Sequence, residues 1–300
     1  MAHQGFHERG WSRAVPAVKL EPLLDGLSFG EAPRWRATSN GGRLYFSDFY
    51  LHQVRSVDEA GKAETIVEVP GRPSGLGWRP DGTMLIVSMT DRRLMRFSGG
   101  KLSVEAELGA LATGPCNDMI VDGTGRAYVG NFGFDRHAGE AQRTTCLIRV
   151  DPDRSVHKAA DDLLFPNGTV ITPDGKTMIV GETFAHRLTA YDIATDGNLA
   201  NRRVWAAIEG CYPDGICLDA EGAIWVSDPF GRRVMRVLEG GKVTHSLDLA
   251  PRGAYACMLG GADRRTLFVV TNSGSGPTMG QKRDGRIETM RVDVPGAGLP

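Results

Sequence analysis

Short apolar segments separated by turn residues recur along the whole chain of 300 residues. Each apolar segment leads into a loop rich in Ser, Asp, Asn and Phe. A second segment then follows, in which basic or polar residues alternate with apolar ones. Such alternation is typical of half-buried β-strands, and no long stretch repeats its apolar positions at the helical period. The pattern therefore predicts an all-β chain.

The same unit of strands and loops occurs six times. Equivalent aromatic or aliphatic positions lie 41, 42, 51, 46 and 43 residues apart, at Tyr45, Ile86, Tyr128, Ile179, Trp225 and Phe268. This is the repeat length of propeller blades, and each unit has room for four strands. We therefore expect a six-bladed β-propeller with four-stranded antiparallel blades.

The two ends of the chain are expected to meet in one blade. The sixth unit ends soon after its third strand, and the run at residues 18–24 lies before the first inner strand. This N-terminal strand can complete the last blade and so close the ring, which covers edges that would otherwise invite aggregation. The predicted organisation is an N-terminal extension at residues 1–16 and a single propeller domain at 17–300.

Composition narrows the classes of partner. The net charge of -1 and the pI near 6.7 leave no basic excess for nucleic acid. The N-terminus lacks the apolar core of a signal peptide, and nowhere do eighteen apolar residues follow one another. We expect a cytoplasmic monomer or small homo-oligomer with no membrane partner. The five cysteines form no C-x-x-C pair and are expected to be buried free thiols.

A polar position recurs where each inner strand should start. It lies seven residues before the turn that joins the first two strands, except in the first unit, whose turn at residues 39–42 is longer. The residues found in this way are Glu31, Ser74, Asn117, Asn167, Asp214 and, more loosely, Ala256. Asn or Asp before Gly can be simply a turn former. Five polar oxygens at one repeat position favour instead a site for one divalent ion, Ca²⁺, Mg²⁺, Mn²⁺ or Zn²⁺.

The loops between second and third strands should open on the same face as this polar ring. Four of the five loops at residues 48–50, 131–135, 182–184, 228–230 and 271–273 carry Phe. Phe132 and Phe184 are therefore candidate substrate contacts, together with Asn131, although such Phe residues can also pack one blade against the next. An aromatic cup over a polar floor suits a small organic substrate. Among the histidines, His186 and more weakly His52 are candidates for proton transfer.

Four motifs in this order resemble the SMP-30/gluconolactonase/LRE-like family of six-bladed propeller lactonases. They are Glu31-Ala32-Pro33-Arg34-Trp35, Asn117-Asp118, Phe165-Pro166-Asn167-Gly168 and Tyr212-Pro213-Asp214-Gly215. The resemblance covers residues 20–294 approximately. It implies that Glu31, Asn167 and Asp214 bind one divalent metal, and that Asn117 joins the same shell or contacts the substrate. The implied reaction is lactone hydrolysis, with Asp214 as the base that takes a proton from an activated water.

One position departs from the family pattern. Members that act on sugar lactones have Arg two residues before the third-blade Asn, where this chain has Pro115. We therefore expect a lactone or ester substrate that is less polar than a sugar lactone. Two other hypotheses stay open: a calcium-binding or ligand-binding propeller without catalysis, and a different Lewis-acid reaction in secondary metabolism at the same metal site.

Overall fold

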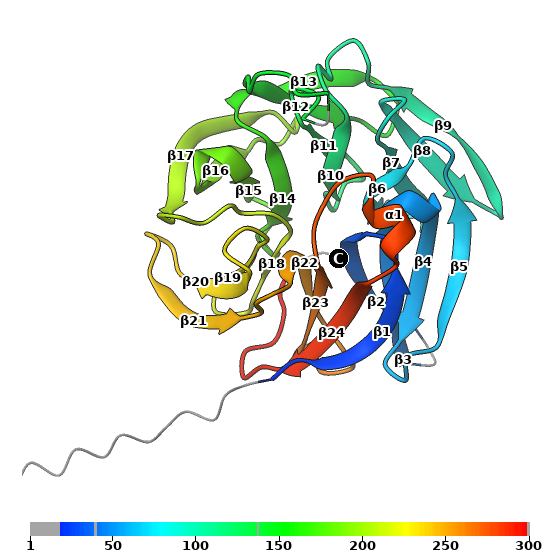
Figure 1. Cartoon of the computed structure of the whole chain (residues 1–300). Coiled ribbons are helices and arrows are strands. Elements are labelled where there is room, and N and C mark those ends of the chain that lie inside the picture. Colours follow the sequence, from blue (N-terminus) through cyan, green and yellow to red (C-terminus); the bar gives the residue numbers. More distant parts are fainter. Residues whose placement is uncertain (1–18, 39–40, 137, 299–300) are drawn as a thin grey trace, which may run out of the picture.

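Six four-stranded antiparallel sheets form a ring around a central channel (Figure 1). The computed structural model describes residues 19–38, 41–136 and 138–298. The six-bladed β-propeller predicted from the repeat is confirmed. The predicted extension at residues 1–16 and part of the long first turn, residues 39–40, lie outside the described residues.

Each of the first five blades runs outward from the channel in chain order. The first three blades comprise β2 (Gly30–Thr38), β3 (Gly41–Asp48), β4 (Gln53–Asp58), β5 (Ala63–Glu68); β6 (Pro73–Trp78), β7 (Met84–Ser88), β8 (Arg93–Ser98), β9 (Lys101–Glu107); and β10 (Cys116–Val121), β11 (Ala127–Asn131), β12 (Thr145–Val150), β13 (Val156–Leu163). The next two comprise β14 (Pro166–Ile171), β15 (Thr177–Glu182), β16 (Arg187–Ile193), β17 (Leu199–Ala207); and β18 (Ile216–Leu218), β19 (Ile224–Asp228), β20 (Arg233–Val237), β21 (Val243–Asp248).

The sixth blade joins the two ends of the chain. It consists of β22 (Gly253–Gly260), β23 (Thr266–Asn272) and β24 (Gly285–Arg291), with β1 (Glu21–Leu27) as its outer strand. β1 pairs antiparallel with β24, and the register places Leu24 opposite Ile287. The predicted closure is therefore confirmed. The strand extends to Leu27, beyond the predicted run, because this fully buried side chain packs in the core of the blade.

Burial falls from the channel outward and explains why the strands differ in sequence. Every residue of the inner strand β14 is buried, whereas nearly every residue of the outer strand β21 is exposed. Inner strands are covered on both faces by neighbouring blades and are therefore rich in apolar and small residues. All five cysteines are free and buried, as expected. No helix within the described ranges is long and apolar enough to cross a membrane.

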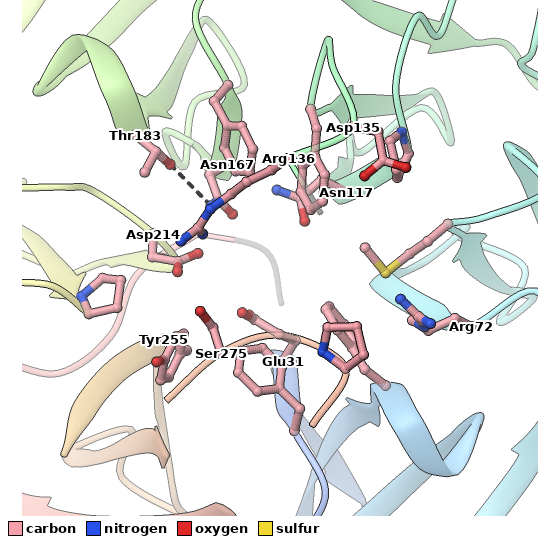
Figure 2. A pocket seen from close by; sticks show the side chains of 18 of the residues that line it. Glu31, Arg72, Asn117, Asp135, Arg136, Asn167, Thr183, Asp214, Tyr255 and Ser275 are labelled. Atoms are coloured by element: carbon pink, nitrogen blue, oxygen red, sulfur yellow. Dashed lines mark hydrogen bonds between the residues drawn. The ribbon is translucent and has the colours of Figure 1, made fainter. Parts of the chain in front are cut away.

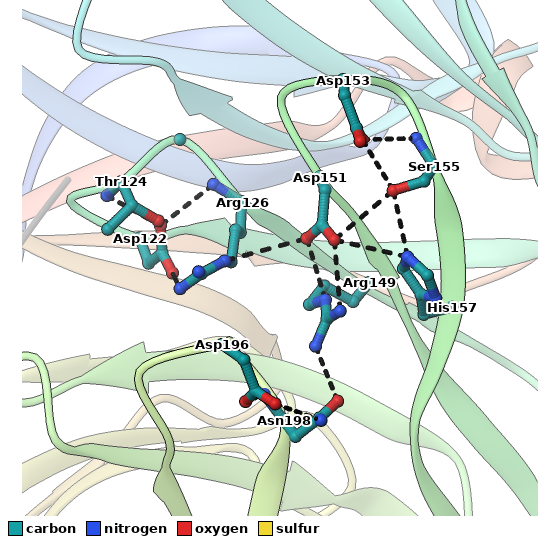
Figure 3. A network of polar contacts seen from close by, with 12 residues as sticks. Asp122, Thr124, Arg126, Arg149, Asp151, Asp153, Ser155, His157, Asp196 and Asn198 are labelled. Atoms are coloured by element: carbon teal, nitrogen blue, oxygen red, sulfur yellow. Dashed lines mark hydrogen bonds and ion pairs between the residues drawn. The ribbon is translucent and has the colours of Figure 1, made fainter.

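The hairpins at the end of the ring opposite the polar ring are joined by ion pairs (Figure 3). Buried Arg149 on β12 donates to Asp151 at 3.1 Å and to Asn198 of the next blade at 2.8 Å. Asp122 accepts hydrogen bonds from backbone amides in its own turn, including that of Arg126 at 3.0 Å. The hydrogen bond between Arg149 and Asn198 connects the third and fourth blades, so this end of the ring contributes to the stability of the propeller.

Candidate functional site

A cavity of about 340 Å³ opens at the end of the channel where the inner strands begin (Figure 2). Its floor contains Glu31 from β2, Asn117 from β10, Asn167 from β14, and Asp214 just before β18. These residues lie far apart in the sequence, and the ring brings them together as the repeat predicted. Two short 3-10 helices and one short α-helix stand among the loops: η1 (Phe49–Leu51), η2 (Thr183–Ala185) and α1 (Met279–Lys282).

Tyr255, rather than Ala256, takes the sixth ring position. Gly168 N donates to Asp214 O at 3.1 Å between blades four and five, and Gly215 N donates to Tyr255 O at 2.8 Å at the next interface. Tyr255 is therefore equivalent to Asp214, and it lines the cavity, whereas Ala256 does not. The expectation for Ala256 was wrong because the sixth blade has one residue more between its ring position and its turn: the last paired residue, Gly260, is five positions after Tyr255, whereas Leu218 is four positions after Asp214. A count made back from the turn is therefore displaced by one residue.

Ser74 supports the site from behind the floor. Its side chain is buried, is absent from the cavity lining, and donates to Asn117 Oδ1 at 3.4 Å. The Asn117 amide nitrogen, Nδ2, is buried and has no hydrogen-bond partner among the described residues. An unpaired buried donor is costly, so this nitrogen is available to a substrate oxygen.

The orientation of the Asn167 amide is set by a chain of hydrogen bonds. Thr183 Oγ1 donates its proton to Pro213 O at 2.7 Å, and it therefore accepts from Asn167 Nδ2 at 3.2 Å. Because Nδ2 is used in this way, Asn167 Oδ1 is the oxygen left for a further partner. Figure 2 shows Thr183, Asn167 and Asp214 on the same side of the cavity.

Two carboxylates face the cavity without a cationic partner, buried Asp214 and half-buried Glu31. Burial raises the pKa of Glu31 well above its usual value, and the negative charges of Asp214 and Asp118 raise it further. Burial likewise raises the pKa of Asp214, although its hydrogen bond with Asn167 opposes this shift. Neither carboxylate forms an ion pair with any residue that the structure describes, whereas Asp118 is paired with Arg34 at 2.8 Å.

This donor set fits a divalent cation. Glu31, Asn167 and Asp214 present oxygen atoms only, and a cation between them would offset the cost of two desolvated carboxylates. Across the described ranges there is no group of three or more His, Cys, Asp or Glu residues that could hold a metal. A metal at this site would therefore need a third ligand of another type, such as the amide oxygen of Asn167.

An aromatic wall rises from the floor on the side of blades three to five. Phe132 stacks on Phe165 with ring centroids 4.3 Å apart, and Phe184 meets the edge of Phe165 at 5.0 Å. These rings line the cavity, and the stacked pair also packs blade three against blade four. Contact of Phe132 and Phe184 with a substrate stays a prediction. Phe134 is buried behind them and does not line the cavity.

Asn131 lies outside the cavity lining. Its amide is saturated within its own blade, because Nδ2 donates to Cys146 O at 3.0 Å and Oδ1 accepts from Gly133 N and Thr145 Oγ1. Asn131 is the last residue of β11, where the predicted mouth loop begins. The structure shows that its side chain turns into the blade and holds the loop.

The two candidate histidines occupy equivalent structural positions outside the cavity. His52 and His186 each end a short 3-10 helix in the left-handed conformation, with φ of 56° and 54°. Each ring contacts a backbone carbonyl of the following loop through Nδ1: Pro70 O at 2.8 Å and Cys211 O at 2.7 Å. Because the same contact occurs in two blades, packing of each histidine against the following loop explains both residues.

Two arginine side chains at the cavity mouth were not predicted from the sequence. Arg72 and Arg136 both line the cavity. Arg72 precedes Ser74 by two residues, as Pro115 precedes Asn117. The repeat could therefore have identified Arg72 as a residue that lines the cavity. Arg136 lies just beyond the aromatic loop of the third blade, and no pattern in the sequence marked it.

Comparison with solved structures supports the fold. Regucalcin from Agrobacterium tumefaciens, described as a calcium-binding protein, superposes with a TM-score of 0.79 at 22% identity, over 94% of this chain and 97% of that chain. A gluconolactonase from Xanthomonas campestris superposes with a TM-score of 0.72, also at 22% identity, over 94% and 91% of the two chains. At 22% identity, these similarities are evidence for the fold alone.

Sequence relatives cover nearly the whole chain. The 6-deoxy-6-sulfogluconolactonase of Pseudomonas putida is 28% identical over 90% of this chain and 94% of its own length. Regucalcin of Gallus gallus is 29% identical over 86% of this chain and 88% of its own length. The sequence profile of the SMP-30/gluconolactonase/LRE-like region matches residues 29–273. The chain therefore belongs to the SMP-30/gluconolactonase/LRE-like family.

Proposed function

We propose that this protein is a metal-dependent lactonase, which opens a lactone to its hydroxy acid at the mouth of the channel. The observation that carries the proposal is the meeting of two carboxylates that form no ion pair among the described residues, Glu31 and Asp214, with the oriented amide of Asn167 on the cavity floor. Relatives named as lactonases support the same reaction class.

Glu31, Asn167 and Asp214 would hold the metal, which on binding supplies a Lewis acid that polarises a carbonyl and acidifies water. Asp214 accepts the proton of the attacking water as the carbon–oxygen bond forms. The ring carbon–oxygen bond then breaks, and the leaving alkoxide takes the proton back from Asp214. Asn117 Nδ2, which has no partner of its own, donates to the carbonyl oxygen as it gains negative charge.

The cavity walls favour a lactone with fewer hydroxyl groups than a sugar lactone. Pro115 lines the cavity where sugar-lactone hydrolases of the family carry Arg, and it offers no donor to a sugar hydroxyl. Opposite, Phe132 and Phe184 present ring faces and edges to the substrate. Apolar walls bind the body of such a substrate, while the floor binds its ester group.

The test is a lactone panel assayed by acid release. The protein is chelated, reloaded with Ca²⁺, Zn²⁺, Mn²⁺ or Mg²⁺ singly, and given aliphatic, aromatic and sugar lactones. We expect turnover only after reloading, and a fall in kcat/KM of about a thousandfold in Asp214→Asn. The matched control is Asp174→Asn, which removes the same charge from an exposed turn. Full turnover by the chelated protein refutes metal dependence.

A binding protein without catalysis is the second candidate. The similarity to a regucalcin that is described as calcium-binding favours it. The same panel separates the two, because tight Ca²⁺ binding with no turnover on any lactone supports the binding protein. Turnover of a non-lactone substrate would instead support another Lewis-acid reaction at this site.

A further inference from the structure

A second tier of residues lies directly above the polar ring, two positions earlier in each repeat. The backbone carbonyls of Phe29, Arg72, Pro115 and Phe165 accept equivalent hydrogen bonds from the loops that follow the second strands, at 2.9, 2.9, 2.9 and 3.1 Å. All four residues line the cavity. Three are apolar, so Arg72 is the one charged member of this tier among those four.

The Arg72 side chain is held in place but not neutralised. Its guanidinium lies over the ring of Tyr50, 4.8 Å from the centroid. Burial raises the pKa of Tyr50, which keeps this ring neutral at pH 7 and suited to a cation. Arg72 Nε is buried without a hydrogen-bond partner, and no carboxylate of the described residues pairs with Arg72.

A second guanidinium stands across the mouth. Arg136 lies over the ring of Phe230 at 5.4 Å, and Figure 2 shows it on the side of Asp214, whereas Arg72 lies on the other side of the cavity. The charges of the lining are three carboxylates, from Glu31, Asp135 and Asp214, and these two guanidiniums. A divalent ion on the floor would leave the cavity with one net positive charge.

We propose that the lactone substrate carries an acidic group, a carboxylate or another oxyanion, and that Arg72 binds it. The inference rests on the lactonase function proposed above and specifies its substrate class. The guanidinium is the side chain best suited to an oxyanion, because it offers two parallel donors. The apolar part of the substrate lies on Phe132 and Phe165, between the acidic group and the ester.

The experiment measures binding, so that it does not depend on turnover. The probes are a γ-lactam that bears a carboxyphenyl substituent and the same lactam with a carboxamide in place of the carboxylate. Calorimetry gives the Kd of both for Ca²⁺-loaded wild type, Arg72→Gln, Arg72→Lys, Arg136→Gln and Arg36→Gln. Arg36 is the matched control, because its guanidinium lies over Trp78 at 4.6 Å and it does not line the cavity.

We expect wild type to bind the carboxylate at least about tenfold more tightly than the carboxamide, as a charge-assisted contact should. This preference disappears in Arg72→Gln, is partly kept in Arg72→Lys, and is unchanged in Arg36→Gln. Equal Kd values for the two probes in wild type overturn the proposal. A preference lost in Arg136→Gln but kept in Arg72→Gln overturns the assignment to Arg72. If the preference for the carboxylate probe holds while no lactone of the panel is turned over, only the proposed lactonase function fails.

Discussion

Replacing Gly168 by Ala should separate two blades at the cavity floor. A Cβ at this position would lie 2.5 Å from Ile216 N, 2.6 Å from Asp214 O and 2.8 Å from Gly215 Cα. All three are backbone atoms of the next blade and cannot rotate away. Gly168 N also donates to Asp214 O at 3.1 Å, directly beside Asn167. The perturbation therefore acts where two of the three proposed ligands are held.

The size of the effect follows from these distances. Ordinary contacts of a Cβ begin at 3.4 Å, so the blades must move apart by about 0.9 Å to relieve the shortest contact. Overpacking of this kind costs about 1–3 kcal/mol, and three rigid neighbours place Gly168→Ala at about 3 kcal/mol. For a chain of this size the midpoint of thermal unfolding should fall by roughly 6 °C.

Gly123→Ala is the matched control. A Cβ at Gly123 meets nothing within 4 Å, and its φ is not positive, so this change should leave stability within about 1 kcal/mol of wild type. Urea unfolding gives the free energy of each variant, and calorimetry gives its Ca²⁺ affinity. We expect Gly168→Ala to lose both stability and affinity. Equal stability and equal Ca²⁺ affinity of the two variants would refute the reasoning.

Three further predictions concern charge and burial. Glu31→Gln should weaken Ca²⁺ binding by more than about tenfold, yet stabilise the chelated protein at neutral pH. Burial raises the pKa of Glu31, so this gain is absent near pH 4, where the carboxyl is protonated, and grows as pH rises; a pH series of thermal midpoints checks it. Arg149→Met should lower the free energy of unfolding in urea by about 2–3 kcal/mol, because it breaks a buried network. Arg93→Met should lower it by less than about 1 kcal/mol, because the pair of Arg93 with Glu107 is exposed, and similar losses in the two variants would contradict this. Burial raises the pKa of Cys116 to about 12, so native protein should not react with Ellman's reagent at pH 8, and rapid labelling would count against it.

Much of the fold could be predicted from the chain because each blade is a local unit. Strand, hairpin and loop recur within some forty to fifty residues, and the apolar pattern of each strand reports its own burial. The ring position of Glu31, Asn167 and Asp214 followed from the same repeat. The closure by β1 followed from a count of strands.

Side-chain direction at the mouth could not be predicted in this way. Asn131 and Phe132 are neighbours on one loop, yet Asn131 is saturated inside its blade and Phe132 lines the cavity. The difference depends on Thr145 and Cys146, which the second half of the blade brings to the loop. A long insertion separates Asn131 from β12, so the spacing of the repeat did not predict this contact.

The sequence by itself determined the six-bladed ring, its closure and the ring positions of Glu31, Asn167 and Asp214, because these depend on patterns that repeat within each blade. Only the tertiary structure decided that Tyr255 takes the sixth position, that Ser74 stands behind the floor, and that Arg72 faces the cavity unpaired. These outcomes depend on contacts between adjacent blades, whose residues lie 22 to 43 positions apart in the three cases. The neighbouring blade decides which side chains remain free to face the channel.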